Sequence, residues 1–377
     1  MHSSLVSIYS QHPIRFKYAE GAYLYDKNGA KYLDMLSGIS VTNLGHNHPK
    51  LQKVAKEQLD QFWHTSNLFT SELQESLASE LCKRSGLDYA FFCNSGTEAN
   101  EAAIKFARAF HPEKYKIVTM QGGFHGRTLG SLSATAQVHL QQPFKPMCSG
   151  FIPVPFNNLF AIEQAIDSET CAVMLEPILG EAGVVLPEKG FLTKLRKLCD
   201  SYGILLIMDE VQTGLGCTGT HFCYQWEGII PDILTLAKGI ANGLPLGATL
   251  CSEKVNSALS VGDHGSTFGG NPVSVAVAQA VLDELSSDLF IKINQLGAIF
   301  SEQLSSLSHV KEIRQKGLMI GVELSVSAKD VAKDLITQGI LVGTSGEYVL
   351  RLLPPFIVTE IEIERTVNTL KSILRNK

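Results

Sequence analysis

The sequence predicts an α/β fold in two parts: a large domain with a mostly parallel sheet flanked by helices, and a smaller α+β domain. Short apolar runs alternate with helical patterns at least four times between residues 88 and 238. This alternation is typical of βαβ units, in which crossover helices join parallel strands. Residues 311–357 carry strand–helix–strand signals instead, and a last helical pattern covers about 360–375. The change of pattern predicts a second, smaller domain.

These patterns predict that the chain is divided into three segments. We expect residues 1–48 to be an N-terminal segment that belongs to the small domain, residues 49–275 to form the large domain, and residues 276–377 to complete the small one. Within the first segment, apolar and polar residues alternate on both sides of Asn28-Gly29, a strong hairpin signal. This pattern predicts an antiparallel meander.

Composition narrows the class of protein. The 377 residues carry a net charge of -5, and 45% of them are hydrophobic. Nothing here supplies the basic field that binds nucleic acid. No apolar run reaches the roughly 20 residues of a transmembrane helix, and the chain start lacks the charged and apolar regions of a signal peptide. We therefore expect a cytoplasmic protein without nucleic-acid or membrane partners.

Cysteines and histidines do not indicate a metal or a disulfide framework. The eight cysteines include no CxxC pair, so we expect buried free thiols in a reducing compartment. His46 and His48 stand two residues apart. They could ligate a metal, but no third ligand stands at usable spacing, and we expect no metal site.

Two apolar runs, each bounded by turn signals, end in opposite charges. The run at 204–208 leads into Asp209, and the run that follows Pro231 leads to Lys238. In an open α/β sheet the carboxyl ends of the strands border the ligand crevice. Pyridoxal phosphate needs this pair, because a lysine holds it covalently and an acid partners its pyridine nitrogen. A plain internal ion pair is the alternative.

Three further segments follow predicted strands. Ser95 and Glu98 form a capping box that opens a helix, and the N–H groups of Gly96 and Thr97 are left open to a phosphate. Phe124 and Arg127 lie in a glycine-rich loop, where the ring could stack on a cofactor and the guanidinium could hold a carboxylate. Ordinary helix capping and a surface turn with a solvated arginine are the alternatives. Glu176 is another carboxylate at a strand end.

With these motifs in order, the chain resembles the class III aminotransferases of pyridoxal-phosphate fold type I. The resemblance runs from about residue 14 to the end. The stretches that carry it are Asn94–Ala99, Gly123–Arg127, Asp209–Gln212, Leu236–Gly239 and Ser266–Asn271.

The resemblance implies a role for each residue of a pyridoxal 5'-phosphate site. Lys238 and Asp209 would be catalytic: Lys238 would bind the cofactor and shuttle a proton, and Asp209 would pair with the pyridinium nitrogen. Gln212 would bind the ring hydroxyl. The other predicted cofactor contacts are the sandwiching residues Phe124 and Val211, the phosphate-side residues Ser95, Gly96 and Thr97, the acid Glu176, and Thr267, which would reach the phosphate of the other subunit in a homodimer.

The resemblance also implies the substrates. Arg127 and Arg351 resemble the two arginines that bind substrate carboxylates, and Glu181 resembles a gate that pairs with Arg351 when 2-oxoglutarate is absent. Ile39 and Ser266 would complete the substrate side. The implied reaction moves the terminal amino group of N2-acetylornithine to 2-oxoglutarate and gives N-acetylglutamate semialdehyde and glutamate, a step of arginine biosynthesis.

Several alternatives stay open within this resemblance. The donor could be 4-aminobutyrate, ornithine or succinylornithine, and an aminomutase is a further relative. Ornithine-specific sequences carry a tyrosine at the position of Ile39, so this residue excludes ornithine better than it proves acetylornithine. A cofactor-binding protein without turnover would need no second carboxylate arginine. Leu179 and Cys217 depart from the glutamine and arginine that are usual in the family.

Overall fold

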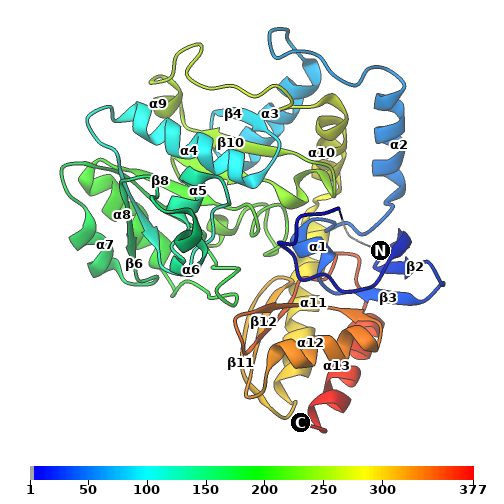
Figure 1. The fold of residues 1–377 in the computed structure, drawn as a ribbon. Helices are drawn as coiled ribbons and strands as arrows, with labels where there is room; N and C mark the ends of the chain where they lie inside the picture. Colours follow the sequence, from blue (N-terminus) through cyan, green and yellow to red (C-terminus); the bar gives the residue numbers. More distant parts are fainter. Residues whose placement is uncertain (1–3) are drawn as a thin grey trace.

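A seven-stranded sheet forms the larger of two lobes in the computed structural model, which describes residues 4–377 (Figure 1). From edge to edge its strands are β4 (Tyr89–Cys93), β10 (Gly247–Cys251), β9 (Ile233–Leu236), β8 (Leu205–Asp209), β7 (Thr170–Leu175), β5 (Lys116–Met120) and β6 (Phe151–Val154). β10 runs against both of its neighbours, and the remaining pairs are parallel. The predicted mostly parallel sheet is confirmed, although the sequence did not indicate β10.

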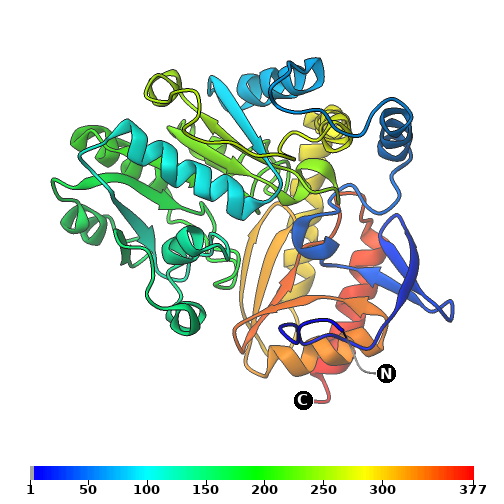
Figure 2. The ribbon, with the colours of Figure 1, turned by 45° about the horizontal axis from the view of Figure 1, so that its top comes forward.

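Helices cover both faces of this sheet, which explains why its strands are continuous apolar runs. Consecutive strand residues belong to two different cores. Ile207 packs in the core that includes residues of α4 (Gly96–Phe110), whereas Met208 packs in the core that includes α8 (Phe191–Tyr202) and α3 (Glu72–Ser85). Figure 2 shows α4 lying across the near face of the sheet.

Shorter elements complete this lobe. They are α5 (Leu129–Ala134), α6 (Val138–Gln141), η1 (Gln142–Phe144), α7 (Leu159–Ala165), η2 (Cys223–Glu227), η3 (Lys238–Ala241) and α9 (Glu253–Asn256). The long helix α10 (Pro272–Glu284) packs on α2 (Pro49–Leu59), α3 and η3. The predicted boundary at residues 275 and 276 falls inside α10, and the domain limits stay a proposal.

The smaller lobe is an antiparallel sheet with helices packed against it. Its strands, in spatial order, are β11 (Val310–Lys316), β12 (Met319–Leu324), β15 (Val349–Leu352) and β14 (Gly343–Ser345). Three helices accompany them, namely α11 (Ser287–Ser305), α12 (Ala328–Thr337) and α13 (Glu360–Leu374). They occupy the lower part of Figure 1, in yellow to red.

The N-terminal meander joins this lobe through one short strand. β1 (Phe16–Glu20), β2 (Tyr23–Asp26) and β3 (Lys31–Asp34) pair antiparallel, and β13 (Ile340–Leu341) adds to β3 in parallel. The predicted hairpin at Asn28-Gly29 is confirmed: Gly29 has φ +86°, and the Asp26 side chain accepts the N–H groups of Asn28 and Ala30, both at 2.8 Å. The one-turn element α1 (Ser37–Ser40) follows.

No helix among residues 4–377 combines the length and the apolar composition that a membrane crossing needs. In the same part of the chain, no cluster of three or more histidine, cysteine, aspartate or glutamate side chains has the arrangement of a metal site.

Candidate active site

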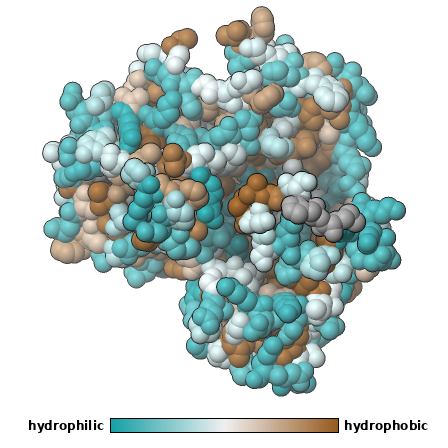
Figure 3. Space-filling view, in the orientation of Figure 1, coloured by the Kyte–Doolittle hydropathy of each residue, from teal (hydrophilic) through white to brown (hydrophobic). Residues whose placement is uncertain are grey.

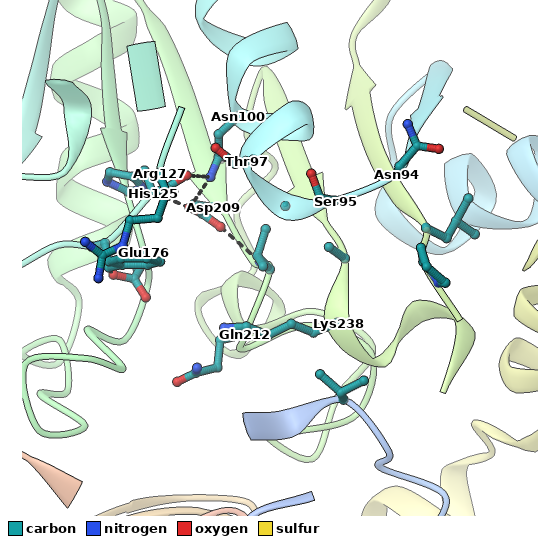
Figure 4. A pocket seen from close by; sticks show the side chains of 18 of the residues that line it. Asn94, Ser95, Thr97, Asn100, His125, Arg127, Glu176, Asp209, Gln212 and Lys238 are labelled. Carbon is teal, nitrogen blue, oxygen red and sulfur yellow. Dashed lines mark hydrogen bonds and ion pairs between the residues drawn. The ribbon is translucent and has the colours of Figure 1, made fainter. Parts of the chain in front are cut away.

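A cavity of about 410 Å³ opens at the carboxyl ends of the parallel strands. Residues that follow β4, β5, β7, β8 and β9 all contribute to its wall, as expected for an open α/β sheet. Figure 4 shows the side chains of the lining residues, with Asp209, Glu176 and Lys238 among those labelled. The strand-end charges of the sequence therefore meet in one place.

Asp209 is a buried carboxylate with three hydrogen-bond donors. It is 2% exposed. Asn100 Nδ2 donates to Oδ2 at 2.7 Å, His125 Nδ1 lies 2.7 Å from the same oxygen, and the Val211 N–H donates to Oδ1 at 3.0 Å. Thr235 in turn donates its hydroxyl to Asn100 Oδ1 at 2.7 Å. The dashed lines in Figure 4 mark contacts of Asp209 with other residues of the cavity wall, and these contacts fix the direction of the carboxylate.

The hydrogen bond to Asp209 favours the protonated form of the His125 imidazole. Burial by itself would lower the pKa of the imidazole, but its hydrogen bond to Asp209 and the charge of that carboxylate outweigh burial and raise the pKa. The ring's other nitrogen, Nε2, is buried and has no partner among the described residues. His125 therefore holds Asp209 Oδ2 while the Val211 N–H holds Oδ1, at the wall of the cavity.

Lys238 has no charged partner, which excludes the structural ion pair with Asp209. Its ammonium makes no hydrogen bond or ion pair with residues 4–377. It begins η3 with φ +47°, in the left-handed region that most residues avoid. Burial lowers the pKa of the amine, against the opposing charges of Glu176, Glu181 and Asp209. A lowered pKa favours the neutral, nucleophilic amine.

Glu176 is a second buried acid on the cavity wall. It accepts the Phe124 N–H at 2.9 Å and the Gly180 N–H at 3.4 Å. Burial, followed by the negative charge of Asp209, raises the pKa of the Glu176 carboxyl to about 7. This carboxyl can therefore hold or release a proton near neutral pH.

The start of α4 is shaped for an anion. Ser95 caps the helix, since its hydroxyl accepts the Glu98 N–H at 3.3 Å and donates to the Glu98 carboxylate at 2.9 Å. The predicted helix cap is confirmed, and both hydrogen bonds of the Ser95 hydroxyl are made with Glu98. The N–H groups of Gly96 and Thr97, at the first two helical positions, have no helical acceptor and border the cavity. A side chain at Gly96 would lie 2.7 Å from Val211 Cγ1, so only glycine leaves this space open.

The cavity residues fit a phosphorylated aromatic cofactor of the pyridoxal type. Phe124 and Val211 both line the space and provide apolar surfaces. Gln212 is 4% exposed, and its Oε1 has no donor among residues 4–377. A buried acceptor without a donor is unfavourable, and the hydroxyl of a bound ring would satisfy it. Asp209 would hold the ring nitrogen of such a cofactor, and the free N–H groups at the start of α4 would hold its phosphate.

A second cavity of about 730 Å³ shares Phe124 and Arg127 with the first, and Glu181, the partner of Arg351, is on its wall. Arg351 on β15 is 3% exposed, and its Nη1 donates to Glu181 Oε1 at 2.5 Å. Its Nε has no partner among the described atoms. Arg127 is exposed, and its guanidinium carbon lies 5.5 Å from the Phe124 ring centre.

Five predicted residues do not line the first cavity within one chain: Glu181 and Arg351, described above, and Ser266, Thr267 and Ile39. Ser266 accepts the N–H of Gly269 at 3.0 Å with its hydroxyl, and Thr267 is exposed on the same loop. Ile39 is 39% exposed on α1, and Val41 is the neighbouring residue that reaches the cavity. In a site shared between two chains, residues on such exposed segments would contact the cavity of the second chain and not the cavity of their own.

Sequence reasoning missed Asn100 and His125, which orient Asp209. The signal for Asn100 was an amide in an alanine-rich helix, where a polar side chain competes with helical hydrogen bonds unless it has a partner.

The two residues that depart from the usual family pattern, Leu179 and Cys217, are both buried. Leu179 pairs with Val185 in a short bridge, and Cys217 Sγ lies 3.3 Å from Ser40 Oγ.

Comparison with known proteins gives a consistent result. The model of the aminotransferase class-III family matches residues 7–374. An acetylornithine aminotransferase of Bacillus cereus is 45% identical, over 100% of this chain and 99% of that protein. The crystal structure of an N-acetylornithine aminotransferase from Stenotrophomonas maltophilia has a TM-score of 0.86 at 34% identity, with 98% of both chains covered. An ornithine aminotransferase of Toxoplasma gondii, which holds partially occupied PLP, has a TM-score of 0.93 at 32% identity, over 99% of this chain and 92% of that one.

The role of Lys238 can be tested by covalent labelling. Borohydride reduction in the presence of pyridoxal phosphate, followed by peptide mapping, should place the label on Lys238, because its buried amine has a lowered pKa and no partner. Lys238→Ala should not be labelled in the cavity, and Lys254→Ala, at an ion-paired site on α9, should be labelled as the parent is. A label on another lysine would contradict the assignment.

The raised pKa of Glu176 predicts a pH-dependent stability. The folded chain keeps a proton up to about pH 7, whereas an unfolded glutamate releases it near pH 4.3. The stabilising effect of the bound proton is therefore complete at low pH and is lost as the pH rises through 7. Relative to wild type, Glu176→Gln should gain up to about 3 kcal/mol in free energy of unfolding between pH 5 and 8.

Urea unfolding of the cofactor-free chain at several pH values measures this difference. Glutamine retains an oxygen that accepts the Phe124 N–H, so the variant tests the charge rather than the hydrogen bond. Glu188→Gln, at an exposed position, should show no pH-dependent difference. A difference that stays constant across the pH range for Glu176→Gln would refute the raised pKa.

Proposed function

The chain belongs to the class III aminotransferase family, and we propose that it transfers the terminal amino group of N2-acetylornithine to 2-oxoglutarate. The products would be N-acetylglutamate semialdehyde and glutamate, in a cytoplasmic step of arginine biosynthesis. One observation carries this proposal: the similarity to acetylornithine aminotransferase extends over the whole chain at 45% identity. Class III aminotransferases depend on pyridoxal 5'-phosphate, and the cavity fits that cofactor.

Residues of the first cavity would hold the cofactor at both ends. When bound, pyridoxal phosphate supplies an electron sink that lets a C–H bond beside an amino group break. Asp209 would hold a proton on the ring nitrogen, with Asn100 and His125 keeping its carboxylate in place. Gln212 Oε1 would accept the ring hydroxyl. The free N–H groups at the start of α4 would bind the phosphate, helped by the helix dipole.

Lys238 would bind the cofactor covalently and move the proton during the reaction. Its position on η3, beside the carboxyl end of β9, brings the amine into the cavity next to Asp209 and Glu176. Burial lowers the pKa of the amine, so that it can accept a proton from carbon near neutral pH.

Arg127 and Arg351 would bind the carboxylates of the two different substrates. Arg127 would bind the carboxylate at the far end of the donor, and the exposed position of its guanidinium suits a bidentate contact. Arg351 would bind a carboxylate of 2-oxoglutarate. While the ω-amino donor is present, Glu181 would pair with Arg351 at 2.5 Å and keep this buried cation neutralised.

Donor choice would depend on the apolar side of the site at Ile39 and Val41. A free α-ammonium brought against isoleucine loses water without gaining a partner, whereas an acylated nitrogen carries no charge and is less costly to desolvate. The lower desolvation cost of the acylated nitrogen favours N2-acetylornithine over ornithine. It does not separate N2-acetylornithine from succinylornithine or 4-aminobutyrate, for which the overall similarity is the guide.

The donor assignment predicts a ratio of kcat/KM values. N2-acetylornithine should exceed ornithine by a factor that corresponds to roughly 1–3 kcal/mol, the cost of an unpaired buried polar group. Ile39→Tyr should reduce this ratio because its hydroxyl can bind the ornithine ammonium. Ile361→Tyr, on the exposed side of α13, is the control and should leave the ratio unchanged. A higher kcat/KM for ornithine or 4-aminobutyrate than for N2-acetylornithine would overturn the assignment.

We further propose that the active unit is a homodimer that shares its sites. Large apolar side chains are exposed on two loops, with Trp63, Leu68 and Phe69 on one and Phe268 on the other, at 62–89% exposure. Brown side chains stand at the upper edge of Figure 3, where these loops lie. An exposed apolar patch favours a protein interface. Thr267, between Ser266 and Phe268, would then reach the phosphate of the second chain.

Sedimentation tests the dimer. The protein with its cofactor should sediment as a dimer, and Thr267→Ala should weaken the retention of pyridoxal phosphate, seen as a higher Kd, without dissociating the dimer. Thr337→Ala, on a distant helix of the smaller lobe, should leave the Kd unchanged. A fully active monomer is incompatible with a shared site.

A further inference from the structure

The loop that carries Glu181 has a strained conformation. It follows β7, and Gly183 and Val184 have φ +104° and +58°. For a β-branched residue such as Val184, the left-handed region is rare and sterically unfavourable. Val184 is also fully buried. Such a conformation persists only where surrounding contacts impose it, so the contacts of this loop need an explanation.

The smaller lobe supplies these contacts. Arg314 Nε on β11 donates to the carbonyl of Gly183 at 2.9 Å, and the Ser345 hydroxyl on β14 donates to the carbonyl of Glu181. Gly321 on β12 packs directly below, where a side chain would lie 2.7 Å from the Gly183 oxygen. Three strands of one sheet thus hold a loop that belongs to the other lobe.

Arg314 is itself held in one orientation. Its Nη1 donates to Glu323 at 2.8 Å and to Glu312, and the guanidinium is 14% exposed. Charge-assisted hydrogen bonds of this kind are strong and directional. Because two carboxylates orient the Nη1 side, Nε is left aimed at the Gly183 carbonyl. Arg314 and Glu181 also line the same 730 Å³ cavity.

We propose that Arg314 is the positioning residue that keeps the Glu181 carboxylate on Arg351, and so helps to set the balance between ω-amino and α-amino substrates. This inference rests on the proposed function of Glu181 as a gate. Arg314 holds Gly183, which fixes the loop, and the loop delivers Glu181 Oε1 to within 2.5 Å of Arg351 Nη1. A looser loop would release Arg351 to bind a dicarboxylate more readily.

Arg314→Lys is the most direct variant. It retains the positive charge beside Glu312 and Glu323, but a single ammonium cannot replace the guanidinium fork and also reach the Gly183 carbonyl. Arg108→Lys is the matched control, because Arg108 Nε donates to the carbonyl of Tyr115 at 3.1 Å in a part of the larger lobe remote from Glu181. Ser345→Ala removes the second anchor of the loop and serves as an independent variant.

Two measurements on the holoenzyme read the effect. Calorimetry gives the Kd of glutarate, a dicarboxylate without an amino group, which must displace Glu181 to reach Arg351. Single-turnover rates give the ratio of the half-reaction with glutamate to that with N2-acetylornithine. Arg314→Lys should lower the glutarate Kd by about tenfold and raise the glutamate ratio by about the same factor, the size of one charge-assisted hydrogen bond.

The double variant Arg314→Lys, Glu181→Ala decides the mechanism. Glu181→Ala alone should shift both measurements in the same direction, and Arg314→Lys should add nothing in its background. The proposal is overturned if both half-reactions fall equally, if Arg108→Lys has the same effect, or if Arg314→Lys still shifts the glutarate Kd without Glu181. The calorimetric measurement uses no amino donor, so it judges Arg314 even if N2-acetylornithine proves to be a poor substrate.

Discussion

The burial of the Asp209 carboxylate is the constraint on which the larger lobe depends. A buried charge without compensation costs several kcal/mol, and here the compensation comes from three separate segments: Asn100 on α4, His125 after β5 and the backbone of Val211. Thr235 on β9 extends the network by holding Asn100. The hydrogen bonds that compensate for the burial of Asp209 also orient its carboxylate toward the cavity. The same contacts therefore stabilise the fold and set the geometry of the site.

Unfavourable backbone conformations gather around this network. Lys238 and Asn242 lie at positive φ at the two ends of η3, and Ser37, Ile39 and Ser40 of α1 do so as well. Each needs support from its surroundings. The Asn242 side chain accepts the N–H of Leu44 at 2.8 Å and donates to the carbonyl of Gly45 at 3.0 Å, which joins η3 to the segment after α1.

His46 completes that support. Its Nε2 lies 2.9 Å from Asp34 Oδ2, and Asp34 Oδ1 accepts the N–H groups of Leu36 and Ser37 at the start of α1. His48 immediately precedes α2. The two histidines that could be read as metal ligands thus lie in separate environments, and His46 fixes the turn that carries Ile39. Lys238 on η3 and the turn that carries Ile39 are therefore parts of one connected unit.

The sequence by itself determined most of the elements, although not β10, and the edge of the sheet at which the candidate site residues gather. Apolar runs on both core faces, the Asn28-Gly29 hairpin and the Ser95 cap are encoded by neighbouring residues, and parallel strands place their carboxyl ends together whatever the details of packing. Only the tertiary structure decided how each of two adjacent acids is held. Asp209 lines the cavity, whereas Glu210 binds the N–H groups of Cys223 and Tyr224 in the core. It also decided that Glu181 and Arg351, 170 positions apart, meet at 2.5 Å, because such contacts depend on how two lobes pack and no local pattern records that.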